Sequence, residues 1–313
     1  MGVERRHALA SAALGRTTTT SPEESPGQAA LTGIAGQIID ISPHLVILEN
    51  PDGEEERLVI APWATAWHGR PTAPAELPAG TRVMIRARQS GRVAERLWGD
   101  ITRVTGVILA LGRDGRDLTV VLDCGPHRGT RNVVVPYGAS GRIRVRHPQF
   151  EPGFLFDAIG TRRDGVTRVA LPATSQPTYR AASVPSPPPA YRAVQSRISG
   201  TAAWSDAFDD GEAGVAYPML ERADSECEDA GVSCTGLPYL ALGSMLYVGN
   251  VCESRGAVLP IVACGCMAGR FCDRCVECGT SPRGRIAELS PLSFVELGGE
   301  LTNGCFNARV GLG

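Results

Sequence analysis

The stretch Leu118-Thr119-Val120-Val121-Leu122, followed by Val133-Val134-Val135-Pro136, decides the predicted fold. Both runs are short, apolar and rich in β-branched residues, and turn residues separate them, which is typical of neighbouring β-strands. The same order of runs occurs earlier in the chain, at residues 45–48 and 58–62. We therefore interpret this region as two copies of one all-β unit, each of about 70 residues, the size of a small OB-like or SH3-like barrel.

Further matches extend the repeat in both directions. Residues 105–108 resemble residues 32–34, and residues 141–146 resemble residues 80–85 if the first copy carries an insertion at residues 63–78. The repeat therefore predicts strands in all the matched segments. It also predicts two tandem barrels, the first over residues 31–103 and the second over residues 104–172.

Segments without a strand pattern flank these barrels. Residues 1–30 are rich in Thr, Ser, Pro and Gly, which predicts a disordered N-terminal tail. Within this tail, Arg5-Arg6 and a short apolar run resemble a twin-arginine export signal, but no clear cleavage site follows. Residues 173–200 contain Pro187-Pro188-Pro189 and predict a Pro-rich linker with few contacts. Residues 201–313 would then fold as a separate domain.

Charge divides the chain into two unlike parts. The 31 basic residues are all Arg, and with 33 acidic residues they give a net charge of −2. Residues 201–313 carry 15 Asp and Glu against 7 Arg (−8), which leaves 18 acidic residues against 24 Arg (+6) for residues 1–200. The acidic part has few cations for phosphate contacts, and the basic part has few aromatics for base stacking. We therefore expect structural or protein-docking barrels and no nucleic acid partner.

No apolar run approaches the ~18 residues that a membrane-spanning helix needs, so no membrane segment is predicted.

The cysteines are unevenly placed. Nine of the ten lie after residue 226, whereas all five histidines lie before residue 148. The last domain is therefore a cysteine-rich unit without histidine, and Cys124 is a lone cysteine of the second barrel.

Two interpretations of these nine cysteines remain open. In the first they form up to four disulfides with one thiol left over, as in small secreted domains; the candidates are Cys227, Cys234, Cys252, Cys264, Cys266, Cys272, Cys275, Cys278 and Cys305. In the second, the close spacing of four of them supplies a structural zinc site or an iron–sulfur cluster; these are Cys266, Cys272, Cys275 and Cys278. The dispersed positions of the other cysteines favour disulfides and no cofactor.

Five segments of the last domain occur in a recognisable order: residues 242–248, 256–262, 273–279, 285–294 and 304–310. The most specific of them contain Asp273-Arg274-Cys275-x-x-Cys278 and Leu289-Ser290-Pro291-x-x-Phe294. This order resembles the double-psi β-barrel of the barwin, expansin and RlpA group, over about a third of the chain. The resemblance implies a third barrel at residues 201–313. Strand patterns in this domain agree with it, as does a short helix expected after Ser290.

Members of this group bind or cleave cell-wall polysaccharide, with an Asp as proton donor. The resemblance places that role on Asp273 and a second carboxylate at Glu288. A partly buried carboxyl suits glycosidic cleavage because it can hold and deliver a proton. However, residues 264–272 intervene before the acid, and the domain has no histidine to partner it. These departures favour binding over cleavage.

We therefore expect a cell-envelope or extracellular protein that binds polysaccharide or peptidoglycan, although no convincing signal peptide is present. The expected ligand-binding residues are the aromatics Trp204, Tyr217 and Tyr239, together with Arg274. One alternative is a glycan-cleaving enzyme, lytic or hydrolytic, that uses Asp273. Another is a protein-assembly or inhibitor protein, for example a component of a phage-like particle, that docks a partner through its N-terminal barrels.

Overall fold

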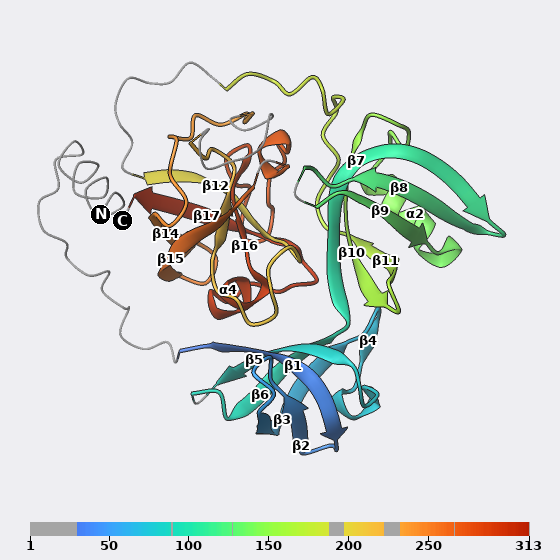
Figure 1. Cartoon of the computed structure of the whole chain (residues 1–313), viewed down its shortest axis with the longest axis vertical. Coiled ribbons are helices and arrows are strands. Elements are labelled where there is room, and N and C mark those ends of the chain that lie inside the picture. Colours follow the sequence, from blue (N-terminus) through green and yellow to red (C-terminus); the bar gives the residue numbers. More distant parts are fainter. Residues whose placement is uncertain are drawn as a thin grey trace, which may run out of the picture.

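The structure is a computed structural model that describes residues 30–88, 90–126, 128–187, 197–221, 232–265 and 267–312. Nearly all regular elements are strands, and they form three closed barrels (Figure 1). The described part of the chain holds two α-helices and no helix that is long and apolar enough to cross a membrane. The prediction of an all-β chain of several barrels is confirmed. The predicted tail, up to residue 29, lies outside the described residues.

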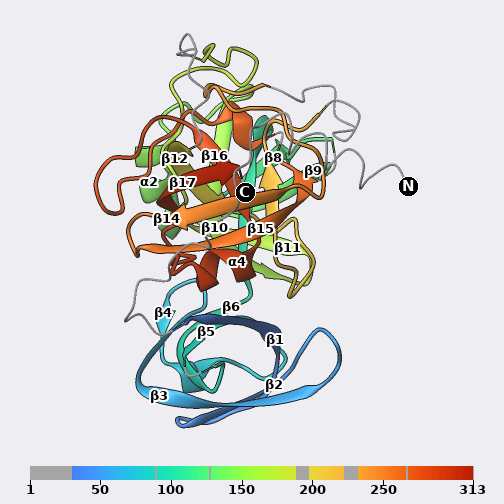
Figure 2. The ribbon, with the colours of Figure 1, turned by 90° about the vertical axis from the view of Figure 1, so that its left-hand side faces the viewer.

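The first barrel has five strands: β1 (Thr32–Ile41), β2 (Leu45–Glu49), β3 (Glu55–Trp67), β5 (Arg82–Arg88) and β6 (Val93–Gly99). It closes because β2 pairs with both β1 and β3, while β4 (Pro71–Thr72) and the 3-10 turn η1 (Pro74–Glu76) fill the connection before β5. Figure 2 shows this barrel as a closed ring beside the other two. Alternate apolar side chains such as Val46, Leu48 and Ile85 point inward and are buried.

The second barrel repeats this arrangement with β7 (Ile101–Asp114), β8 (Asp117–Asp123), β9 (Thr130–Val135), β10 (Leu155–Arg163) and β11 (Val166–Pro172). Its strand order is β10-β11-β9-β8-β7, which corresponds strand for strand to the order β5-β6-β3-β2-β1 of the first barrel. The closing pairs, β3 with β6 and β9 with β11, are both parallel. Five strands in this repeated order agree with the OB-like alternative of the prediction.

The strand predicted at residues 141–146 is wrong, because these residues lie in the helix α2 (Tyr137–Arg146). Arginines alternate with apolar residues here, as in a half-buried strand, but Ala139 and Ile143 are the buried pair, and their spacing of four is helical. Val145, which a strand would bury with Ile143, is 79% exposed. The counterpart of β5 in the second barrel is therefore β10, after the helix.

The third barrel has six strands: β12 (Arg197–Trp204), β13 (Val215–Tyr217), β14 (Met245–Asn250), β15 (Arg255–Cys264), β16 (Arg285–Leu289) and β17 (Cys305–Leu312). Their order is β12-β16-β13-β15-β14-β17, and β12 pairs with β17 to close the ring. The expected short helix is α4 (Pro291–Glu296), and the Ser290 hydroxyl caps it by accepting a hydrogen bond from the Ser293 N–H at 3.1 Å.

The prediction of a linker with few contacts is wrong for residues 173–181. Ala173, Thr174 and Ala181 are buried. The Tyr179 hydroxyl donates to the Arg270 carbonyl at 2.7 Å and accepts from the Cys272 N–H at 3.0 Å. Residues 173–181 therefore form a strap that is packed between the second and third barrels. Residues 182–187 are exposed or half-buried, and residues 188–196 lie outside the described part.

The three barrels also share a hydrophobic core. One buried cluster contains Trp67 and Trp98 of the first barrel, Ile159 of the second, and Trp204 and Phe306 of the third. The Trp98 indole N–H also donates to the Glu300 carboxylate at 2.9 Å, across the boundary between the first and third barrels. The contacts between the barrels are therefore those of one protein core rather than of domains on a free tether.

Candidate functional site

Both predicted acids contact Arg285, the first residue of β16. The Nε and Nη2 atoms of Arg285 donate to Oδ2 of Asp273 at 3.2 and 3.1 Å, and its Nη1 lies 3.7 Å from Oε1 of Glu288. Asp273 is 7% exposed and Glu288 is wholly buried. The structure thus brings the two carboxylates to one place, but it places an arginine between them.

The second barrel covers this place. Asp157 of β10 accepts a hydrogen bond from Nη2 of Arg285, and it accepts from Nε and Nη2 of Arg103 at 2.9 and 2.7 Å. The hydroxyls of Thr105 and Thr174 donate to the same carboxylate at 3.1 and 2.8 Å. Asp157 therefore has charged or hydroxyl donors on all sides, from its own barrel, from the strap and from the third barrel.

Two further arginine contacts join the barrels. Nη2 of Arg128, in the loop between β8 and β9, lies 3.0 Å from Oε2 of Glu288. Nη1 of Arg103 donates to the carbonyls of Trp204, at 3.0 Å, and Gly304. We call the six ionic residues the interbarrel cluster; they are Arg103, Arg128, Asp157, Asp273, Arg285 and Glu288. Three arginines and three carboxylates make it neutral when all are ionised.

Burial alone would raise the pKa of Asp157, but the charges of Arg103 and Arg285 outweigh burial and hold this pKa well below its ordinary value. Burial would conversely lower the pKa of Arg285, but Asp157, Asp273 and Glu288 raise it above its ordinary value. The core of the cluster is therefore charged at neutral pH. A glycosidic proton donor must reach its substrate. Asp273 and Glu288 do not meet this condition, because both are buried in contacts with arginines.

Some buried polar atoms of the interbarrel cluster lack a hydrogen-bond partner. Oδ1 of Asp273, Nη1 of Arg285 and Oε1 of Glu288 are buried and have no hydrogen-bond partner among the described residues. Buried atoms of this kind usually contact an ordered water. No three His, Cys, Asp or Glu side chains in the described ranges are grouped as a metal site.

Two of the expected ligand-binding aromatics are core residues. Trp204 and Tyr217 are almost completely buried, and their polar atoms donate to the carbonyls of Leu301, at 2.9 Å, and Pro238, at 3.1 Å. The prediction that they contact a glycan is therefore wrong, because neither ring reaches the surface. The reason is that β12 and β13 are buried on both faces, so an aromatic there has no solvent side.

The other two expected residues are exposed. Tyr239, in the segment before β14, is 57% exposed. Arg274 follows Asp273 in the loop before β16, and its guanidinium donates to the Ser281 carbonyl at 3.1 Å. These two side chains can meet a ligand, although they come from different loops.

The sequence analysis missed a second partly exposed aromatic of the third barrel, Tyr247 of β14. A Cβ atom on Gly256 would lie 2.2 Å from its hydroxyl oxygen, and one on Gly249 would lie 3.2 Å away. Gly249 and Gly256 are partners across β14 and β15, so the half-buried ring lies over this pair of glycines. The signal was available, because two glycines that oppose each other in a hairpin leave room for a flat ring.

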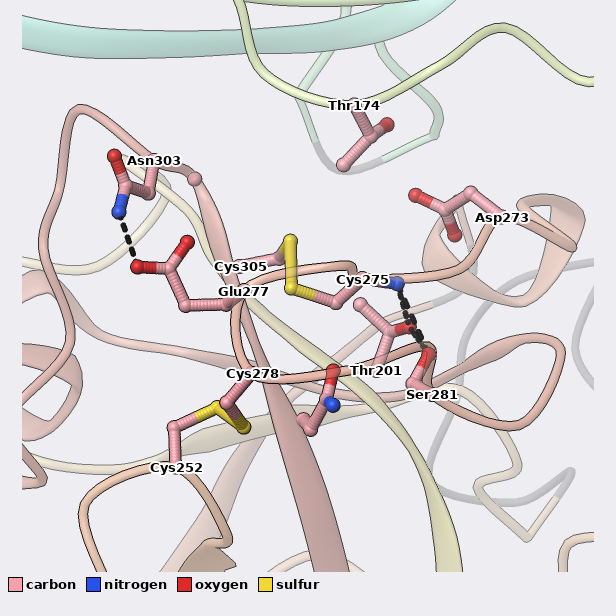
Figure 3. Close-up of a disulfide and its surroundings, with 12 residues drawn as sticks. Thr174, Thr201, Cys252, Asp273, Cys275, Glu277, Cys278, Ser281, Asn303 and Cys305 are labelled. Atoms are coloured by element: carbon pink, nitrogen blue, oxygen red, sulfur yellow. Dashed lines mark hydrogen bonds between the residues drawn. A yellow bond between two sulfur atoms is a disulfide. The ribbon is translucent and has the colours of Figure 1, made fainter.

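Disulfides fix the loop that carries Asp273. The bonded pairs are Cys234–Cys272, Cys252–Cys278 and Cys275–Cys305, and Cys264 is disulfide-bonded as well. Figure 3 shows the two pairs of the loop, with Asp273 on the side near Thr174 and the Cys275 N–H directed at the hydroxyls of Thr201 and Ser281, at 3.1 and 2.9 Å. The predicted disulfide interpretation is confirmed for these seven cysteines, while Cys227 and Cys266 lie outside the described residues.

The zinc alternative needed thiolates from Cys272, Cys275 and Cys278, and in the structure all three are in disulfides. A disulfide sulfur has no thiolate to offer a metal. Cys124 is a free, buried cysteine of the second barrel, and burial raises the pKa of its thiol to about 11.

A cavity of about 110 Å³ lies where the three barrels meet, and its lining includes several acidic residues. Two of these acids are paired with arginines: Asp206 accepts from the Thr102 hydroxyl and lies 2.9 Å from Arg131, and Asp210 contacts Arg82. The cavity is therefore part of the junction between the barrels.

No protein-family model and no curated protein matches the chain. The function must therefore be argued from the geometry described above, together with the resemblance of the third barrel.

Proposed function

We propose that this protein is a non-catalytic, disulfide-stabilised polysaccharide-binding protein of the cell envelope or the extracellular space. The observation that carries the proposal is the position of Arg285 between Asp273 and Glu288, beneath the second barrel. A lytic or hydrolytic enzyme needs an accessible acid, and here both candidate acids are buried in ion pairs. Binding does not need them.

The disulfides support the proposed location. Three of them join cysteines that both lie in the described ranges, and Cys264 takes part in a fourth. Such bonds persist in oxidising compartments and are rare in the cytosol. The resemblance of the third barrel to cell-wall proteins supports the same location.

Tyr239 and Tyr247 are the aromatic side chains that we assign to binding. The apolar face of a sugar ring packs well against a flat aromatic ring, and a tyrosine hydroxyl can also hydrogen-bond to it. Met245 and Val258, which are half exposed on β14 and β15, extend this apolar surface beside Tyr247. The net charge of −8 at residues 201–313 favours neutral polysaccharides over anionic ones.

The test is co-sedimentation of the full chain with insoluble peptidoglycan and with neutral β-glucans. Tyr239→Ala should lower the bound fraction, whereas Tyr137→Ala should leave it unchanged, because Tyr137 is an equally exposed tyrosine (57%) of the second barrel. Equal binding by both variants, or no binding by the wild type, would show that the third barrel has another role.

The enzyme alternative is tested in the same samples. We expect no release of soluble sugar by the wild type, by Asp273→Asn or by Glu288→Gln. Cleavage by the wild type that Asp273→Asn removes would establish the enzyme and would mean that the second barrel moves away from the acid.

A further inference from the structure

Strand β7 of the second barrel extends beyond the strand that covers its edge. Its ladder with β10 ends at the Val107 and Leu155 partners, and the last backbone hydrogen bonds on this side join Ile108 to Phe154 and Gly153, at 2.9 and 2.8 Å. Its pairing with β8 continues to Asp114 and Asp117. Within the described residues, residues 109–114 are therefore paired on one side alone, and all six are exposed.

An unpaired strand edge is a template for another strand. Alternate residues of a strand direct their N–H and C=O groups to opposite sides, so part of the backbone at residues 109–114 faces away from β8. Natural proteins usually protect such edges with proline or inward charges. Residues 109–114 contain no proline, although a register shift interrupts the ladder between Ile108 and Ala110. In Figure 1 the β7–β8 hairpin extends on the side of the second barrel opposite the third barrel, so the third barrel does not cover this edge.

A groove of about 270 Å³ runs beside this edge, and its lining is Leu111, Gly112, Arg113, Leu118, Arg144 and Phe150. Leu118 and Phe150 are partly buried and pack on the hydrophobic core of the second barrel. The floor of the groove is therefore apolar, and it has the size for an apolar side chain of an incoming strand.

The rim of the groove is basic. Arg113 comes from β7 and Arg144 from α2, and neither makes an ion pair within the described ranges. Asp117, the acid that precedes Leu118 in β8, has other partners, because it accepts from the Tyr137 N–H at 2.9 Å and lies 3.6 Å from Arg168. Two guanidiniums are therefore available for acidic groups of a ligand.

We propose that this groove binds an extended acidic peptide that adds to β7 as a further strand. The backbone of the peptide would pair with residues 109–114, alternate apolar side chains would enter the groove over Leu118 and Phe150, and carboxylates would contact Arg113 and Arg144. The open backbone edge favours a peptide over a polysaccharide, because only a peptide repeats donors and acceptors at strand spacing. The charged hairpin end, from Asp114 to Asp117, argues against insertion into a lipid surface.

This site goes beyond the proposed polysaccharide binding, because it lies on a different barrel from Tyr239. The probe is an acetylated, amidated peptide of alternating valine and glutamate, titrated into the full chain in a calorimeter. Arg113→Glu combined with Arg144→Glu should weaken binding by at least about tenfold, because both rim contacts become repulsive. Arg162→Glu combined with Arg163→Glu is the matched control, since it makes the same charge change on β10 and should leave the affinity unchanged.

A second pair of probes tests strand addition itself. One peptide is N-methylated at every valine and the other at every glutamate, so that each lacks the N–H groups of one edge. One of the two should lose binding by at least about tenfold and the other should keep it. Equal binding of both, or equally tight binding of an all-glutamate peptide, would reduce the site to non-specific charge attraction and overturn the proposal.

Sedimentation of the chain without peptide tests whether a second copy of the chain binds this edge. If the chain self-associates, and the double variant at Arg113 and Arg144 abolishes both self-association and any effect of the peptide, a second copy occupies the edge and the peptide proposal is wrong. Circular dichroism of each variant confirms that the barrels are folded.

Discussion

Arg285 of the third barrel donates a hydrogen bond to Asp157 of the second, and both side chains are completely buried. The two residues are far apart in the chain, and their contact lies where the resemblance places a catalytic acid. A buried ion pair of this kind contributes little net stability compared with apolar packing. Removal of one partner is nevertheless costly, because the other charge is left buried without a counter-charge or water. The pair therefore fixes which surfaces of the two barrels meet.

Removal of one charge from this pair should be strongly destabilising. We expect Asp157→Asn to lower the free energy of unfolding by about 3–5 kcal/mol, because Arg103 and Arg285 lose their shared carboxylate. The matched control is Glu151→Gln, which breaks an exposed pair with Arg180 and should cost at most about 1 kcal/mol. Denaturant unfolding at neutral pH measures both values. Similar small losses in the two variants would mean that the cluster is solvated.

Stability should depend on pH through His147. Burial lowers the pKa of this imidazole to about 4 in the folded protein, whereas about 6.5 is ordinary for an unfolded chain. Between these values the unfolded chain binds a proton that the folded protein does not bind. The free energy of unfolding should therefore fall as the pH falls from about 6.5 to about 4, by at most about 3 kcal/mol.

His147→Gln should flatten this pH dependence, because the amide can take over the contacts with the Ile143 carbonyl and the Asp157 N–H without titrating. His44→Gln, at an exposed imidazole, should leave it unchanged. Because the pKa of Asp157 lies well below its ordinary value, its own contribution is complete above about pH 4 and is lost only at lower pH. A slope between pH 6.5 and 4 that survives in His147→Gln would assign it to another group.

The third barrel should depend on its disulfides. Reduction should destabilise it by about 2–5 kcal/mol per bond lost. Thiol titration of the unfolded, non-reduced protein should detect Cys124 and one further cysteine, since nine cysteines in the last domain cannot all pair. Metal analysis of the same sample separates this result from the zinc alternative, which requires stoichiometric zinc together with many free thiols.

The strap should resist proteolysis as long as Tyr179 holds it. Tyr179→Phe removes a hydroxyl that contacts both the Arg270 carbonyl and the Cys272 N–H, so about 1–3 kcal/mol of local stability should be lost. We expect limited proteolysis to leave residues 173–181 intact in the wild type and to cut them in the variant. Tyr137→Phe, whose hydroxyl is not part of the strap, serves as the control. Rapid cutting of these residues in the wild type would show that they form a free linker, as the sequence predicted.

Short-range patterns predicted the architecture well. The duplicated order of apolar runs predicted two barrels of the same kind, and the strand orders of the two are the same. The pattern failed at residues 141–146, because arginines alternating with apolar residues fit a strand as well as a helix with one buried turn. What decided the outcome was the position of Ile143 against the barrel, which is a tertiary property.

The candidate site was predicted only in part. The resemblance placed Asp273 and Glu288 together, and they do share a partner, Arg285. Their burial could not be predicted, because it depends on Arg128 and Asp157 of the second barrel, which no local pattern connects to them. The same holds for Trp204 and Tyr217, since an aromatic in a strand is a core residue or a surface residue according to what covers the strand.

The neutral balance of the interbarrel cluster also constrains how this protein can change over evolutionary time. Loss of Arg285 alone would leave Asp157, Asp273 and Glu288 facing one another with fewer counter-charges, and loss of Asp157 alone would leave two arginines in contact. Substitutions at these positions are therefore tolerated mainly in compensating pairs. In homologous chains, positions 157 and 285 should vary together, and any homologue with an accessible acid at position 273 should also have a changed second barrel.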